Sequence, residues 1–178
     1  MKVHEEHKKE APKKINIALI VVSTSRFNEI QDSKTSSDKT IPLVKQIIEE
    51  NVTISLTYSE IIPDSKDHIK VILNKLVKDP TIDSVIFSGG TGLTSKDITY
   101  EIITPLLEKE IDGFGELFRY LSFKEIGSSA MLSRAIAGTL MGKIIFLLPG
   151  SPNAVKLALN KLILPELGHI TYLIKKEE

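Results

Sequence analysis

The sequence predicts a three-layer α/β/α sandwich with a mostly parallel central sheet. Near-continuous apolar runs, typical of strands covered on both faces, alternate with segments whose apolar residues recur at helical spacing. This alternation favours a sheet with helices on both sides. The 178 residues, of which 42% are hydrophobic, suit a single compact domain with a sizeable core.

The first predicted strand is the apolar, β-branched run at residues 15–22, which follows a charged tail over residues 1–14. Further strands are predicted at residues 53–62, 83–88, 133–140 and 143–148, and the last two are joined by a short turn. The single domain is expected to span residues 15–170. A second charged tail, expected to fray, follows over residues 171–178.

Helices are predicted where apolar residues recur every three or four positions. They lie at residues 40–51, 65–78, 96–104 and 113–123, and a last helix has Ser151 as its N-cap and Pro152 as its first residue. The inward face of the helix at 113–123 is expected to carry Phe114, Leu117, Phe118 and Leu121. The polar stretch from 23 to 38 is predicted to be a flexible loop or a lid.

Composition excludes several classes of function. The 23 basic residues balance the 23 acidic residues, and a neutral chain argues against binding nucleic acid by bulk charge. The absence of cysteine excludes disulfides, thiolate catalysis and thiolate zinc sites, and it permits a cytoplasmic location. No apolar run approaches the ~20 residues of a membrane helix, and the charged first residues do not resemble a signal peptide.

Four polar or glycine-bearing segments each follow a predicted strand. They lie at residues 23–26, 63–64, 89–97 and 149–151. Because the carboxyl ends of parallel strands lie along one edge of a sheet, where ligands bind, we expect these segments to converge on one pocket.

The segment Gly89-Gly90-Thr91-Gly92 has three glycines in four positions, which allow positive φ and close approach of a ligand to the backbone. With the N-terminus of a following helix, its amides would suit a phosphate. A tight turn without a ligand fits these residues equally well. The segment lacks the lysine of a Walker loop and the GxGxxG spacing of a dinucleotide site.

Two aspartates, Asp64 and Asp97, are expected at the same edge of the sheet. Taken singly, each is better explained by helix capping or by a favourable interaction with a helix dipole. Together, beside a phosphate site, they are candidate ligands for Mg²⁺ in phosphoryl or nucleotidyl transfer. Ser23, Thr24 and Ser25 add hydroxyls after the first strand, although turn chemistry also explains them.

Four ordered segments resemble the signature of molybdenum cofactor biosynthesis domains. They are residues 89–97 (GGTGLTSKD), 112–119 (DGFGELFR), 125–135 (EIGSSAMLSRA) and 148–152 (LPGSP). The resemblance covers roughly residues 15–167 and is closest to the MoaB branch of the MoaB/MogA proteins.

The resemblance implies a three-layer α/β sandwich that binds molybdopterin, a pterin with a terminal phosphate. It further implies Mg²⁺-dependent adenylylation of molybdopterin by ATP, giving adenylyl-molybdopterin and pyrophosphate. The family's two functional aspartates correspond to Asp64 and Asp97, which would act on Mg²⁺ and ATP. Residues 89–92 would hold a phosphate, and Ser23, Thr24, Ser25, Ser128, Pro149, Gly150 and Ser151 would line the pocket.

The resemblance also implies a cytoplasmic homo-oligomer, a trimer or hexamer, which passes its product to a metal-insertion enzyme. The chain departs from the family pattern at Ser36-Ser37, where Ser-Gly is frequent, and at Lys96, where some members carry arginine. Two alternatives to the enzyme remain: a non-catalytic molybdopterin carrier that acts with a partner enzyme, and a structural assembly module.

Overall fold

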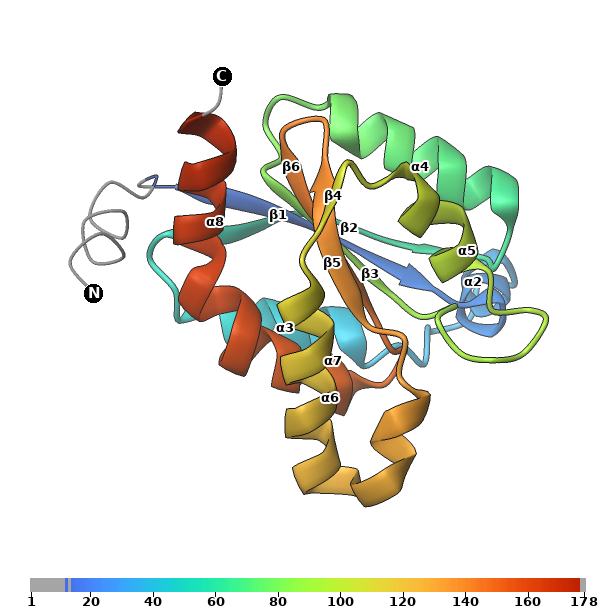
Figure 1. Cartoon of the computed structure of the whole chain (residues 1–178). Helices are drawn as coiled ribbons and strands as arrows, with labels where there is room; N and C mark the ends of the chain where they lie inside the picture. The colour runs from blue at the N-terminus through green and yellow to red at the C-terminus, as the bar shows by residue number, and fades with distance from the viewer. Residues whose placement is uncertain (1–11, 13, 177–178) are drawn as a thin grey trace.

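The computed structural model describes residue 12 and residues 14–176, which form three layers around a six-stranded sheet (Figure 1). The strand order is β2-β1-β3-β6-β5-β4. The strands are β1 (Ile15–Val22), β2 (Ile54–Ile62), β3 (Ser84–Ser88), β4 (Lys109–Glu110), β5 (Ile136–Leu140) and β6 (Lys143–Leu148). β2, β1, β3 and β6 are parallel, whereas β5 is antiparallel to β6 and β4 to β5. The predicted fold is confirmed; the predicted tail at 1–14 lies, apart from residues 12 and 14, outside the described residues.

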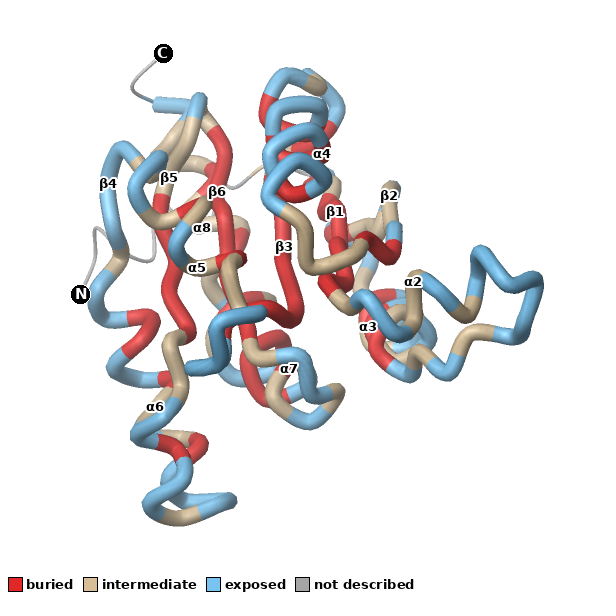
Figure 2. Tube along the Cα trace, turned by 90° about the vertical axis from the view of Figure 1, so that its right-hand side faces the viewer, coloured by how far each residue is buried: buried red, intermediate tan, exposed pale blue. Residues whose placement is uncertain are grey.

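Helices cover both faces of the sheet, so the central strands β1, β3 and β6 are buried between them (Figure 2). One face packs against α4 (Lys66–Lys78) and α5 (Thr99–Ile103); the other packs against α3 (Thr40–Glu49), α6 (Asp112–Ile126), α7 (Pro152–Ala158) and α8 (Leu164–Lys176). Successive residues of β1 point to opposite cores: Leu19 joins the core with α3, and Ile20 joins the core with α4. Packing on both faces of the sheet holds the carboxyl ends of these strands, around which the site is built, in fixed positions.

The segment after β1 is not wholly a flexible loop, which was one of the two forms that its polarity predicted. It begins with α2 (Thr24–Gln31), a helix none of whose residues is fully buried. Only Phe27 packs against the core, and Ser37 donates two hydrogen bonds from its amide and hydroxyl to Glu29 at 2.7 and 2.9 Å. Neither Ser36 nor Ser37 has a positive φ, so the loop does not need a glycine there.

Two further expectations differ from the structure. The helix predicted from residue 96 begins only at Thr99 and passes into a 3₁₀ turn, η1 (Thr104–Leu106). On α6, Phe114 and Phe118 are buried as predicted, but Leu117 is 53% exposed. The spacing of apolar residues does not show how wide the covered stripe of a helix is, so it does not separate Leu117 from its buried neighbours.

The C-terminal helix continues through a π-helical turn, η3 (Leu159–Ile163), into α8, which extends to Lys176. Residues 171–176 are therefore helical, where a fraying tail was expected. Thr171 is buried, and Lys175 forms an ion pair with Asp83 at 2.7 Å. Among the described residues, no helix combines the length and apolar character needed to span a membrane.

Candidate active site at the carboxyl ends of the parallel strands

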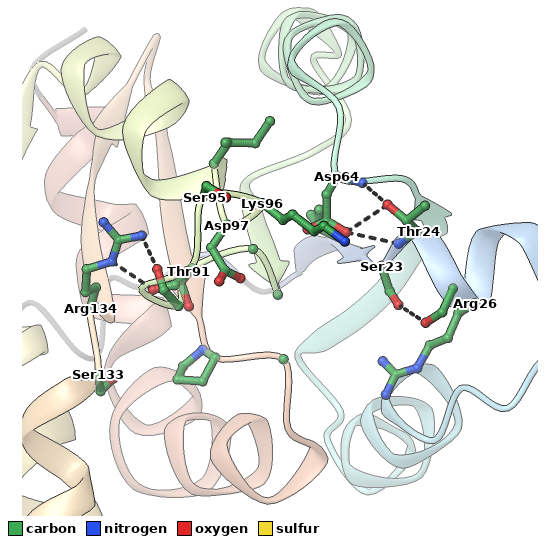
Figure 3. Close-up of a pocket in the computed structure, with 18 of the residues that line it drawn as sticks. Ser23, Thr24, Arg26, Asp64, Thr91, Ser95, Lys96, Asp97, Ser133 and Arg134 are labelled. Atoms are coloured by element: carbon green, nitrogen blue, oxygen red, sulfur yellow. Dashed lines mark hydrogen bonds between the residues drawn. The ribbon is translucent and has the colours of Figure 1, made fainter.

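The loops that follow β1, β2, β3 and β6 meet around one cavity of about 770 Å³ (Figure 3). Most of the predicted site residues line it, namely Ser23, Thr24, Ser25, Asp64, Gly89, Gly90, Thr91, Gly92, Asp97, Pro149 and Gly150. The expected convergence of distant segments is therefore present in the structure. It follows from the parallel order of four strands, which brings their carboxyl ends to one edge.

Two predicted residues, Ser128 and Ser151, are not among those that line the cavity. Ser128 lies exposed in the 3₁₀ segment η2 (Gly127–Leu132). Ser151 is the N-cap of α7, where its hydroxyl accepts a hydrogen bond from the amide of Ala154 at 3.2 Å. Its capping role, also predicted from the sequence, explains its position.

Asp64 is held by Thr24 through a reciprocal set of hydrogen bonds. The amide and hydroxyl of Thr24 donate to Oδ2 of Asp64 at 3.0 and 3.1 Å, and the same hydroxyl lies 3.0 Å from the Asp64 amide, from which it accepts. These bonds satisfy Oδ2 and fix the carboxylate, while Oδ1 faces Gly90. Asp64 does not cap α4, whose N-cap is Ser65.

Asp97 is held in a similar way by Thr94. The amide and hydroxyl of Thr94 donate to Oδ2 of Asp97 at 3.0 and 2.6 Å, and Gly92 is packed close to the same carboxylate. The hydroxyl of Thr94 is the largest cause that lowers the pKa of Asp97 below its usual value; Arg134 contributes in the same direction. Asp97 is therefore an anion at neutral pH.

The glycine loop is shaped by close contacts that exclude side chains. Gly89 has a φ of +110°, and a Cβ there would lie 2.2 Å from the carbonyl oxygen of Val22. Gly90 has a φ of +65°, and its Cβ would lie 2.2 Å from the hydroxyl of Thr99. The turn thus requires glycine at both positions.

Fewer loop amides are available to a ligand than the sequence suggested. The amide of Gly89 donates to the carbonyl oxygen of Leu148 at 3.0 Å, and that of Gly92 is close enough to the Asp97 carboxylate to lower its pKa. Within the described part of the chain, this leaves the amides of Gly90 and Thr91. The helix expected after the loop begins only at Thr99, whose amide donates to the carbonyl oxygen of Gly90 at 2.9 Å.

Further cationic residues line the cavity. Arg26 pairs with Asp38 at 3.4 Å, and Arg134 pairs with Glu101. Lys96 has no acidic partner among the described residues, and Figure 3 shows its side chain extending over the cavity. Arg134 was not singled out from the sequence, although it lies within the resemblance at 125–135. These contacts form only because the fold brings Arg134 close to the glycine loop and to Glu101, which lie 33 to 43 positions earlier in the sequence.

Comparison with known proteins decides the family. A family model described as a probable molybdopterin binding domain matches residues 18–169. The chain belongs to the molybdopterin-binding-domain family. Members of this family are similar to it over nearly their whole length, which confirms the predicted family.

Among these relatives, molybdenum cofactor biosynthesis protein B from Bacillus cereus is 45% identical over 173 residues, covering 97% of this chain and 98% of the relative. A probable molybdopterin adenylyltransferase from Methanocaldococcus jannaschii is 45% identical over 158 residues, covering 89% and 93%. The crystal structure of a molybdenum cofactor biosynthesis protein B superimposes with a TM-score of 0.83 at 44% identity, covering 93% of this chain and 99% of that one.

Proposed function

We propose that this protein is a molybdopterin adenylyltransferase of molybdenum cofactor biosynthesis. The observation that carries the proposal is the pair of fixed carboxylates, Asp64 and Asp97, in one cavity with the glycine loop. The family and the name of the 45% identical archaeal relative point to the same reaction.

In this reaction a phosphate oxygen of molybdopterin attacks the α-phosphorus of ATP. A new P–O–P linkage forms, and the bond from the α-phosphorus to the bridging oxygen breaks to release pyrophosphate. The attacking phosphate is already anionic, so a strong general base is not needed. Catalysis then consists of positioning and neutralising charge.

The donor set around the cavity fits Mg²⁺, which takes oxygen ligands, retains several waters and needs only one or two carboxylates beside substrate phosphates. Asp64 and Asp97 would hold the ion. Oδ1 of Asp64 is free of the bonds that occupy Oδ2, and hydrogen bonds keep Asp97 ionised. When bound, Mg²⁺ neutralises negative charge on the phosphates.

The remaining cavity residues have roles that follow from their positions. The amides of Gly90 and Thr91 donate to a phosphate, and the ammonium of Lys96 lies where it can approach the same anion. Ser23, Ser25, Pro149 and Gly150 form the walls that orient the substrates. Thr24 acts by holding Asp64.

The proposal includes assembly and location. We propose a homo-oligomer, a trimer or hexamer, in the cytoplasm, with hand-off of the product to a metal-insertion enzyme. Exposed large apolar residues on α6 and η2 support self-association, because they are too numerous for isolated surface positions; they are Leu117, Tyr120, Phe123, Ile126, Met131 and Leu132. Light scattering that gives a monomer at micromolar concentration would refute this part.

The activity is tested by incubating the protein with molybdopterin and MgATP and separating the products by chromatography. We expect adenylyl-molybdopterin and pyrophosphate in equal amounts, with the rate reduced at least about a hundredfold in Asp64→Asn and Asp97→Asn. Asp67→Asn, on the exposed first turn of α4, is the matched control and should match the wild type. Molybdopterin binding without any product would instead establish a carrier.

A further inference from the structure

We propose that Arg134 is a positioning residue for Asp97 and acts through the peptide that joins Thr91 to Gly92. The proposal rests on the proposed function, because Asp97 is the candidate magnesium ligand. It adds a role for a residue that contacts the glycine loop from the side opposite Asp97.

Arg134 is fixed by contacts on three sides. Its Nε donates to the carbonyl oxygen of Thr91 at 2.9 Å, and its Nη2 donates to the carbonyl of Gly92. Both Nη atoms also donate to the carboxylate of Glu101. The guanidinium lies over the ring of Tyr100, with Cζ 4.7 Å from the ring centroid. Only a planar fork of donors makes all these contacts together.

The geometry of the peptide bond links Arg134 to Asp97. In a trans peptide the C=O and N–H point in opposite directions from one rigid plane. Arg134 holds the carbonyl of Thr91, which belongs to the same peptide as the amide of Gly92. The amide of Gly92 is therefore directed away from Arg134, and it is among the groups that lower the pKa of Asp97, whose carboxylate lies close to Gly92.

The tight packing at Gly92 makes this link sensitive to small shifts. A Cβ at Gly92 would lie 2.8 Å from Oδ2 of Asp97 and 3.0 Å from Cγ. The carboxylate of Asp97 is therefore packed directly against Gly92. A rotation of the 91–92 peptide plane therefore moves the backbone of Gly92, against which the carboxylate of Asp97 is packed.

Glu101 controls the position of Arg134 and so allows the proposal to be separated from direct substrate binding. If Arg134 acted by contacting a phosphate, removing the charge of Glu101 would leave the guanidinium of Arg134 more available, and MgATP binding would be unchanged or tighter. If Arg134 acts through the loop, loss of its ion pair with Glu101 makes Arg134 more mobile and weakens MgATP binding. The two mechanisms predict opposite signs for Glu101→Gln.

The experiment measures ATP binding by calorimetry, with Mg²⁺ and with EDTA, for Arg134→Lys, Glu101→Gln and the control Glu49→Gln on the exposed end of α3. We expect Arg134→Lys to weaken MgATP binding about tenfold, as is typical when an outer partner of a metal ligand is lost. Glu101→Gln should weaken it a few-fold, and Glu49→Gln should have no effect. Binding of ATP in EDTA should be unchanged in all three variants.

Hydrogen exchange in the ligand-free protein supplies a readout that does not depend on activity. We expect faster exchange at the amide of Gly92 in Arg134→Lys, with unchanged exchange in α4. Equal weakening with and without Mg²⁺, unchanged or tighter binding in Glu101→Gln, or unaltered exchange at Gly92 would each overturn the role of Arg134. If the variants show these effects but the wild-type protein forms no adenylyl-molybdopterin, only the proposed function is refuted.

Discussion

Replacement of Gly90 by alanine tests whether the glycine loop has the shape that the site requires. Its φ of +65° costs an alanine about 1–2 kcal/mol. The new methyl would lie 2.2 Å from the hydroxyl of Thr99, which must leave its rotamer at a cost of about 0.5–1.5 kcal/mol. The Thr99 hydroxyl is buried without a hydrogen-bond partner in the described chain, so no hydrogen bond is lost with it. The free energy of unfolding should fall by about 1.5–3.5 kcal/mol.

This loss corresponds to a decrease in Tm of roughly 3–14 °C for a domain of this size. Gly113→Ala is the matched control, because it lies in the first turn of α6, where a Cβ would meet nothing within 4 Å. Alanine there should raise the stability by up to about 1 kcal/mol. Scanning calorimetry of both variants measures the difference. Equal Tm values for Gly90→Ala and Gly113→Ala would refute the loop geometry.

Three other predictions concern the fold and the loop after β1. Phe118→Ala should lower the free energy of unfolding by about 3–5 kcal/mol, whereas Glu116→Ala, at an exposed position of the same helix, should change it by less than about 0.5 kcal/mol; urea denaturation compares the two variants of α6. Ser151→Ala should lower the free energy of unfolding by about 1 kcal/mol and Ser151→Gly by only a few tenths of that, because the Ser151 hydroxyl caps α7. The KM for the substrates should be unchanged in both variants, and a raised KM would indicate a binding role. The amide of Ser37 and, to a smaller extent, its hydroxyl lower the pKa of Glu29, so Ser37→Ala, which removes only the hydroxyl, should raise that pKa part of the way toward 4.5 in an NMR titration. The stabilisation from these bonds is present above pH 4.5 and is lost as the pH falls through the lowered pKa; an unchanged pKa in Ser37→Ala would contradict the contact.

The strands and the place of the site could be predicted because they depend on strong local signals. Buried parallel strands such as β1 and β3 are continuous apolar runs, and chain direction alone brings their ends to one edge. Asp64 and Asp97 could be placed for the same reason. The start of α5 could not, because the Thr94 hydroxyl and amide engage Asp97 within a turn and delay the helix to Thr99.

Features that depend on contacts between distant residues were not predictable. α2 has a polar sequence, and its place depends on Phe27 packing against the core and on the bonds between Ser37 and Glu29. Arg134 meets the glycine loop only after β5 is positioned beside β6. The number of free amides in the loop also required the tertiary structure, because Leu148 comes from another strand.

The central claim is that Asp64 and Asp97 hold one magnesium ion against the phosphates of ATP. A crystal structure of the protein with MgATP tests it most directly. We expect Mg²⁺ at about 2.0–2.1 Å from a carboxylate oxygen of each aspartate, with a phosphate against the amides of Gly90 and Thr91. An ordered nucleotide and metal bound elsewhere, with both carboxylates free of the ion, would contradict the account.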